Sequence, residues 1–264
     1  MQFPPNPQKG QILLIVILVM VVTLTVGLSV VSRSITTLRI TKEDETSQRA
    51  FSAAEAGIEK IINSSNSSVT GSLTNDASYT TSKSTISGSY LPINGLNAVP
   101  KNDGADVWLS TYPNYASPYT GTVTIYWGQN NEVCSGSSSN TQAALEVVVL
   151  SGAVSSPVST HYSLDPCPSR AAVNNFTTNF SSGSVNGKTY PHTYAISVTN
   201  GLLMRIIPIY ASSIIAVNGS VALPSQGESI TSTGTSGETV RKIIVTKGYP
   251  RLPVEFFPSA IFSH

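Results

Sequence analysis

Apolar residues fill the chain from Ile12 to Val31, where only Thr23, Thr25, Gly27 and Ser29 are not strongly apolar. At about 1.5 Å per helical residue, a helix of this length spans roughly 30 Å, the thickness of the hydrocarbon core of a bilayer. A buried helix of a soluble domain would be shorter or would keep a polar face. The pattern therefore predicts a transmembrane helix over residues 12–31.

After this run the sequence keeps a helical period but becomes amphipathic. Phe51, Ala54, Ile58 and Ile61 follow a 3, 4, 3 spacing, which places them in one stripe along a helix. No Pro occurs between Pro7 and Pro92, so no residue forces a break. We therefore expect one helix over residues 11–62, roughly 75 to 80 Å long. Its second half must leave the membrane and pack against another surface.

A cleaved secretory signal peptide is the alternative for the apolar run. Such a peptide has an apolar region of about 7 to 15 residues and ends in a small-residue cleavage site. Here the apolar run is longer and Arg33 follows it. The helix is therefore expected to remain in the mature chain.

The remainder of the chain reads as β-structure, which makes the predicted fold class α+β: a long N-terminal helix followed by a β-rich, mainly antiparallel head over residues 63–264. Two glycines in Ser232–Glu238 precede an apolar segment and predict a β-hairpin there. If the head has two lobes, the Pro- and Ser-containing stretch at 155–159 is where we place the seam. The clearest strands are expected at 122–127, 143–150, 193–198, 202–210 and 239–246.

Composition favours an exported head. Charged residues make up 11% of the chain and the net charge is +1, whereas ordinary soluble domains have about 25% charged residues. This weak charge gives no electrostatic footprint for nucleic acid. In an oxidising compartment Cys134 and Cys167 would pair in a disulfide; the alternative is two separate buried thiols.

Motifs for catalysis are poorly represented, and we predict neither an enzyme nor a cofactor. The stretch from Ser182 to Thr189 nearly matches a phosphate-binding loop, but β-type residues follow it where a helix is required, so a hairpin tip is favoured. Asn102, Asp103 and Asp106 are weak candidates for calcium ligands, and a turn leading into a strand is the favoured interpretation.

The N-terminal region resembles type IV pilin-like proteins, specifically the PilX-like minor pilins. The resemblance covers about residues 9–62: a leader that ends in Lys9 and Gly10, the apolar helix, and the sequence AFSAAEAGI at 50–58. A weaker resemblance covers the STGTSG and VRKIIVT segments near the C-terminus. The N-terminal resemblance implies a leader over residues 1–10, cleavage by prepilin peptidase after Gly10, and Gln11 as the new N-terminus.

The same resemblance implies that the helix anchors the subunit in the inner membrane and then packs against other pilins or minor pilins in a filament. The residues expected in helix packing are Ile15, Gly27, Phe51, Ala54 and Ile58. Major pilins have Glu at the fifth mature position, which is Ile15 here. Because a carboxylate in the membrane is costly and is kept only for a function, its absence favours a minor, initiating or tip subunit.

The topology rests on the resemblance, because positive charge alone predicts the opposite orientation. Lys9 precedes the apolar run, whereas Arg33, Arg39 and Lys42 follow it. Long domains translocate largely regardless of charge, so we expect a cytoplasmic leader and an extracytoplasmic head. The predicted function is a minor pilin-like structural subunit in assembly or initiation of a type IV pilus or related filament. The alternative is a single-pass membrane-anchored adhesin or binding protein that enters no filament.

Overall fold

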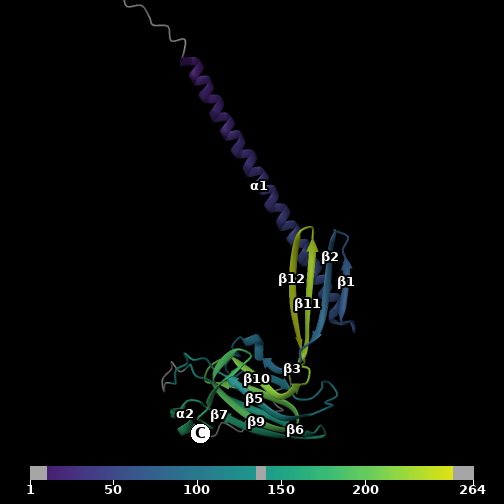
Figure 1. Ribbon diagram of the computed structural model, residues 1–264, viewed down its shortest axis with the longest axis vertical. Helices are drawn as coiled ribbons and strands as arrows, with labels where there is room; N and C mark the ends of the chain where they lie inside the picture. The colour runs from purple at the N-terminus through teal and green to yellow at the C-terminus, as the bar shows by residue number, and fades with distance from the viewer. Residues whose placement is uncertain (1–10, 135–140, 252–264) are drawn as a thin grey trace, which may run out of the picture. The chain divides into compact units, whose positions relative to one another are not determined.

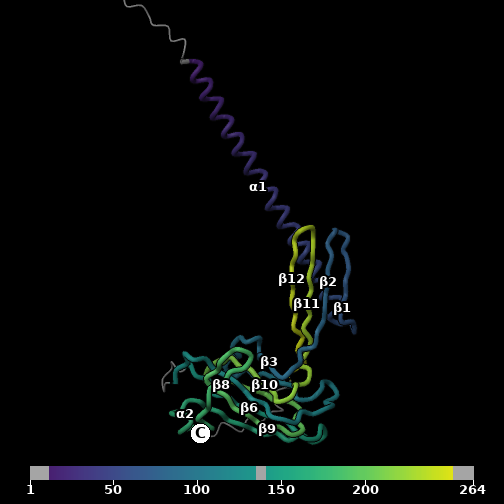
Figure 2. The backbone as a smooth tube through the Cα atoms, in the orientation of Figure 1, coloured from purple at the N-terminus to yellow at the C-terminus, as the bar shows by residue number. Residues whose placement is uncertain are grey.

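The computed structural model describes residues 11–134 and 141–251, and the chain divides into two compact units. The helix unit contains the chain up to Lys83 together with Ile230–Val245. The head unit contains Ser84–Ser229 together with the residues from Thr246 onward. Figure 2 shows how segments from near both ends of the chain come together in the helix unit. The predicted leader, including Gly10, lies outside the described residues.

Helix α1 (Gln11–Ile62) is continuous over 52 residues, and its bounds are those expected from the sequence. Four strands cover its C-terminal turns in the order β1-β2-β11-β12 (Figure 1). Strands β1 (Ser68–Ser72) and β2 (Ala77–Thr85) pair antiparallel. Strands β11 (Gly227–Ser236) and β12 (Thr239–Gly248) complete the sheet.

The predicted hairpin near residue 237 is present, although its turn is shorter than expected. Residues 232–236 belong to β11, and the turn consists of Gly237 and Glu238. Gly237 has φ 57°, which a Gly adopts without steric cost and which two-residue hairpin turns require.

The head unit contains an eight-stranded sheet in which the main path runs β3-β10-β5-β9-β6-β7, with β4 and β8 also paired to β9. Within the described residues the strands of this sheet pair antiparallel, and the long apolar helix followed by antiparallel sheets confirms the predicted α+β class. The remaining elements are β3 (Gly88–Pro92), the 3-10 helix η1 (Ile93–Leu96), β4 (Ala105–Trp108), β5 (Tyr119–Trp127), β6 (Ala144–Ala153), β7 (Ser156–Leu164), α2 (Pro168–Asn174), β8 (Ser181–Val185), β9 (Lys188–Ile209) and β10 (Ile215–Leu223).

Strand β9 is central to the head sheet because it pairs with four other strands, two along each half of its length. Its first half pairs with β5 and β8, and its second half pairs with β6 and β4. The sequence predicted two strands here, separated near Asn200. The chain instead continues through a bulge: Asn200 has φ 53°, and the registers with β5 and β6 both shift around Gly201.

The head core is formed by alternate residues of these strands, and its largest fully buried side chains include Trp127, Leu145, Ile196 and Met204. The predicted seam at 155–159 does not coincide with the division between the two compact units. Those residues form the β6–β7 turn and the start of β7 inside the head unit, where β6 and β7 pair along their length. The near-match to a phosphate-binding loop is the β8–β9 hairpin, with Asn186 and Gly187 at its tip.

Candidate functional site

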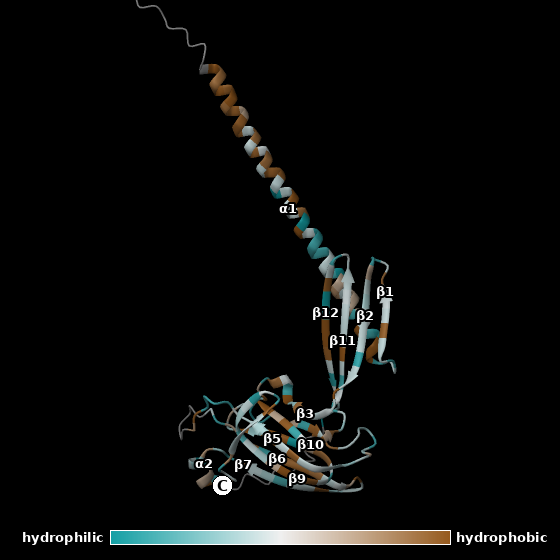
Figure 3. Cartoon of the chain, viewed as in Figure 1, coloured by the Kyte–Doolittle hydropathy of each residue, from teal (hydrophilic) through white to brown (hydrophobic). Residues whose placement is uncertain are grey.

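The first candidate surface is the apolar part of α1. From Ile12 to Val31 its large apolar side chains are exposed, and Figure 3 shows this stretch as the hydrophobic end of the helix. By length and composition, α1 can cross a membrane. Within the span the Thr23 hydroxyl donates to the carbonyl oxygens of Val19 and Met20, at 2.9 and 3.0 Å. Thr25 donates in the same way to Val22. These threonine hydroxyls therefore require no hydrogen bond from outside the helix.

Two of the predicted packing residues lie in this exposed part. Ile15 is 59% exposed, and the position where a Cβ of Gly27 would be has no atom within 4 Å outside the helix itself. Both positions remain accessible to a neighbouring surface. Small residues such as Gly27 allow helix backbones to approach closely inside a membrane.

The second half of α1 packs against its own sheet through small residues. Ala50, Ala53, Ala54 and Ile61 are fully buried there. A Cβ placed on Gly57 would overlap Oγ1 of Thr81 and lie 2.5 Å from Oγ of Ser232. Close approach of helix and sheet therefore depends on this Gly.

The sheet contributes a matching small residue and a buried polar pair. A Cβ on Gly234 of β11 would overlap the carbonyl oxygen of Ala50 and lie 2.7 Å from the amide nitrogen of Ala54. The hydroxyls of Thr81 and Ser232, both completely buried, are 2.7 Å apart and hydrogen-bonded to each other. The pair satisfies two polar groups in a place where water does not reach.

Packing of Phe51, Ala54 and Ile58 against other helices stays a prediction, and within the chain these three residues do not form one buried face. Ala54 is buried on the sheet, Ile58 is half-buried, and Phe51 is 47% exposed. The sheet approaches the helix closely at Gly57 and Gly234, and the residues buried near this approach are Ala50, Ala53 and Ala54. The small residues Ala50, Ala53 and Gly57 at helical spacing carried that signal in the sequence.

Phe51 belongs to a second candidate surface, which we call the basic groove. It has a volume of about 600 Å³ and is lined by α1 and β12 through Ser47, Gln48, Phe51, Ser52, Arg241 and Lys242. Arg241 donates from Nε to Oγ of Ser47 at 2.8 Å. The hydroxyls of Thr46 and Thr239 are 3.0 Å apart and fix the register of β12 on the helix.

In the head unit, two of the three weak calcium candidates, Asp103 and Asp106, are paired with arginines. Arg205 donates to both carboxylate oxygens of Asp106, at 2.6 and 2.8 Å, and this ion pair is buried. Arg251 donates to Asp103 at 2.9 Å in an exposed pair. Asp103 and Asp106 both line a cavity of about 650 Å³, but their charges are neutralised by guanidinium groups. Asn102 has a positive φ of 61°, which is typical of a turn.

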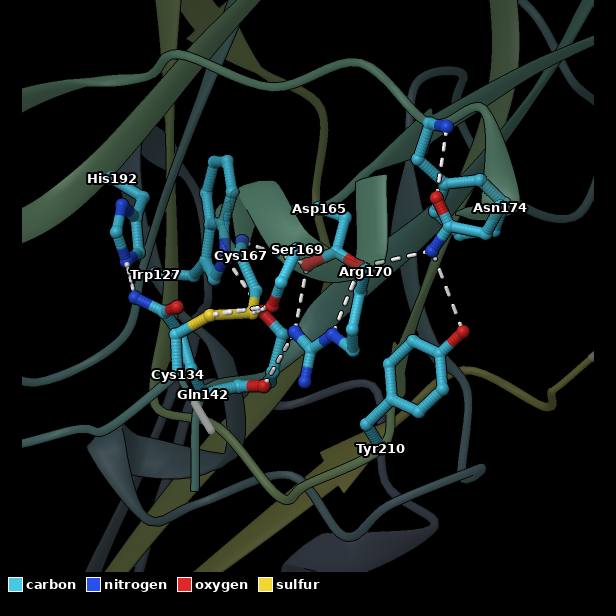
Figure 4. Close-up of polar contacts among 12 residues, drawn as sticks. Trp127, Cys134, Gln142, Asp165, Cys167, Ser169, Arg170, Asn174, His192 and Tyr210 are labelled. Carbon is cyan, nitrogen blue, oxygen red and sulfur yellow. Dashed lines mark hydrogen bonds and ion pairs between the residues drawn. A yellow bond between two sulfur atoms is a disulfide. The ribbon is translucent and has the colours of Figure 1, made fainter. Parts of the chain in front are cut away.

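Cys134 and Cys167 form a disulfide with their Cα atoms 5.4 Å apart (Figure 4). Next to it Arg170 of α2 makes a two-pronged pair with the fully buried carboxylate of Asp165, at 2.7 and 3.0 Å. The same guanidinium lies 4.4 Å from the centre of the Tyr210 ring. The disulfide and the ion pair together tie α2 to its surroundings.

Among the described residues of the head, burial changes the pKa of four titratable groups, and one of them is Tyr190, whose pKa burial raises to about 12. Burial raises the pKa of Glu132 to about 7, and its Oε2 atom has no hydrogen-bond partner within the described ranges. Burial also raises the pKa of Glu146, which the nearby His161 partly opposes. Burial lowers the pKa of His192. Nε2 of His192 is 3.1 Å from Nε2 of Gln142, and a neutral imidazole accepts a hydrogen bond from this amide.

Among the described residues, no group of three His, Cys, Asp or Glu side chains is placed to hold a metal ion. No protein-family model matches the chain, and no curated protein or solved structure matches it either. The architecture of a long N-terminal apolar helix followed by a β-rich head is consistent with that of pilin-like proteins.

Proposed function

We propose that this chain is a PilX-like minor pilin: a structural subunit that prepilin peptidase cleaves after Gly10 and that takes part in assembly or initiation of a type IV pilus or a related filament. Before assembly α1 anchors it in the inner membrane, with the head on the extracytoplasmic side. Its partners are prepilin peptidase and, through α1, other pilins or minor pilins. The protein is a structural component and not an enzyme.

The observation that carries this proposal is the division of α1 into two parts with different surroundings. The part from Ala50 to Ile61 is fixed to its own sheet, whereas Ile12–Val31 is apolar and exposed. Such a surface needs either lipid or other apolar helices around it. A subunit that moves from the membrane into a filament core meets both environments in turn.

Ile15 supports a minor role. The apolar part of α1 contains no acidic residue, so the subunit has no carboxylate to offer a neighbour inside the filament. A place at the tip or an occasional place in the filament fits this better than repetition along it.

Mass spectrometry of the mature N-terminus, in cells with and without prepilin peptidase, tests the processing step. We expect a chain that starts at Gln11 only when the peptidase is present. A Gly10→Val variant should keep its leader and start at Met1 or Gln2, whereas the matched Gly27→Ala variant should be cleaved normally. A wild-type chain that keeps its leader in cells with active peptidase contradicts the proposal.

Purified filaments test the assembly step. The mature chain should be present in sheared, purified filaments at low copy number, and deletion of its gene should reduce filament number. A processed chain that is found only in the membrane would favour the alternative, a membrane-anchored adhesin or binding protein.

A further inference from the structure

We infer that the basic groove binds the acidic turn of α1, Glu43 and Asp44, from a second copy of this chain. The inference rests on the proposed function and adds the surface through which two subunits make contact. Each copy would offer both a groove and an acidic turn.

The groove has the chemistry to bind carboxylates. Arg241 and Lys242 are neighbours in β12 and both are exposed. β12 is the last strand in the order of its sheet, so its outer edge is not covered by another strand of that sheet. The hydrogen bond from Arg241 to Ser47 holds the guanidinium beside α1 and leaves its other N–H groups able to donate. The half-exposed Phe51 ring provides an apolar surface in the groove that Arg241 and Lys242 also line.

The acidic turn is the matching feature on the same helix. Glu43 and Asp44 are exposed, and in the part of the chain that the structure describes neither is in an ion pair. The next carboxylate, Glu45, is already paired with Arg49. Charge complementarity thus selects residues 43 and 44 as the binding segment.

The geometry suits two parallel helices in one membrane. Arg241 lies level with Ser47, which is about four residues beyond the acidic turn. A shift of about 5 Å along the helix axis therefore brings the acidic turn of one copy level with the groove of another. This shift is small compared with the roughly 30 Å hydrocarbon core, so both apolar segments stay in the bilayer.

Lipid headgroups are a poorer match for the groove. Ser47 is sixteen residues beyond Val31, which places the groove about 24 Å beyond the end of the apolar run.

The contact between copies is heterologous, because the groove of one copy binds the acidic turn of the next. A pair of copies therefore keeps one groove and one turn unoccupied.

Site-specific cross-linking of full-length chains in membranes tests the inference. Two differently tagged copies are expressed together, one with Asp44→Cys and the other with Lys242→Cys. We expect a disulfide-linked dimer that contains both tags. The matched control replaces Asp44→Cys by Glu55→Cys, because Glu55 is also an exposed acidic residue of α1. A cross-link no stronger than in this control overturns the inference.

Charge reversal gives a second readout, measured by co-purification in detergent. Either Glu43→Lys with Asp44→Lys, or Arg241→Glu with Lys242→Glu, should weaken association about 5- to 30-fold, as expected for the loss of two exposed ion pairs. Mixing the chain with the reversed acidic turn and the chain with the reversed groove should restore association. Reversal of Glu55 and Glu59 should change little. Loss without restoration, or association that 0.5 M salt leaves unchanged, contradicts the pairing.

The test of the groove can fail or succeed independently of the test of the proposed pilin function. Cleavage after Gly10 and presence in filaments are measured on the same variants. A chain that is processed and incorporated but gives no specific cross-link refutes the groove and leaves the pilin function standing. A specific cross-link in a chain that is never processed supports the groove and refutes the pilin function.

Discussion

The contact between Gly234 and α1 makes the most direct prediction about stability. In Gly234→Ala the new methyl group would overlap the Ala50 carbonyl oxygen and lie 2.7 Å from the Ala54 nitrogen. These are backbone atoms, so no side-chain rotation relieves the clash. To reach the 3.4 Å of an ordinary contact with the Ala54 nitrogen, helix and sheet must separate by about 0.7 Å, and relief of the closer overlap with the Ala50 oxygen requires more. A gap of 0.5 to 1 Å forfeits about a quarter to a half of each dispersion contact.

We therefore expect Gly234→Ala to destabilise the helix unit by about 2 to 3 kcal/mol, near the upper end for overpacked cores. Hydrogen exchange measured by mass spectrometry suits this test, because a chain with two units need not unfold in one step. Peptides from 50–62 and from β11 should exchange about 30 to 150 times faster, since every 1.4 kcal/mol is tenfold. Peptides from β6 in the head unit should be unchanged.

The matched control is Gly248→Ala at the end of β12, where a Cβ meets no atom within 4 Å. It makes the same chemical change in a strand without the clash, so its exchange should stay within about threefold of wild type. If Gly234→Ala exchanges like Gly248→Ala, the close helix–sheet contact does not hold the unit together and the reasoning fails.

Three further predictions concern the head. Asp106→Ala should cost about 3 to 5 kcal/mol in urea unfolding because it leaves a buried arginine charge without its carboxylate, whereas Asp103→Ala in an exposed pair should cost less than about 1 kcal/mol; equal costs would contradict the burial argument. Replacing both cysteines of the Cys134–Cys167 disulfide by Ser should destabilise the head by about 3 to 4 kcal/mol, measured against oxidised wild type, with no loss in reducing buffer. Glu132→Gln should act through pH: the folded-state pKa is raised to about 7, so the contribution of Glu132 to stability is fully present below about pH 4.5 and is lost as pH rises through 7. After allowance for solvent screening, the variant should be about 1 kcal/mol more stable than wild type at pH 8 and equal to it near pH 4.5; a constant difference across this range would exclude titration of Glu132 as the cause.

The helix and the fold class could be predicted from the sequence because both depend on local patterns. Twenty nearly continuous apolar residues and the absence of Pro are sufficient to define α1. The pairing of β2 with β11 could not be predicted, because no local signal joins residues near 80 to residues near 230. β9 was expected as two strands, since Asn200 and Gly201 are typical of a turn and only pairing on both sides shows that they form a bulge.

The packing face of α1 illustrates why a candidate site was only partly predicted. Spacing identified the correct part of the helix, but hydrophobicity directed attention to the large residue Phe51 instead of Gly57. At a close contact between helix and sheet, a Gly permits the approach because it has no side chain. Hydropathy scales give Gly little weight. The basic groove was not predicted because Arg241 and Phe51 are 190 residues apart in the sequence.

The helix unit is built from two segments far apart in the sequence, and this fixes the order in which its parts are synthesised. β11 and most of β12 follow almost the whole head in the sequence, so α1 and β2 emerge long before the strands that complete their sheet. Until residue 236 has been made, β2 lacks one neighbour and the Ala50–Gly57 face of α1 lacks part of its cover. A chain truncated before Ile230 would therefore keep its apolar helical segment and most of its head sequence but not the finished junction between helix and sheet. The junction is therefore complete only after β11 and β12 have been synthesised.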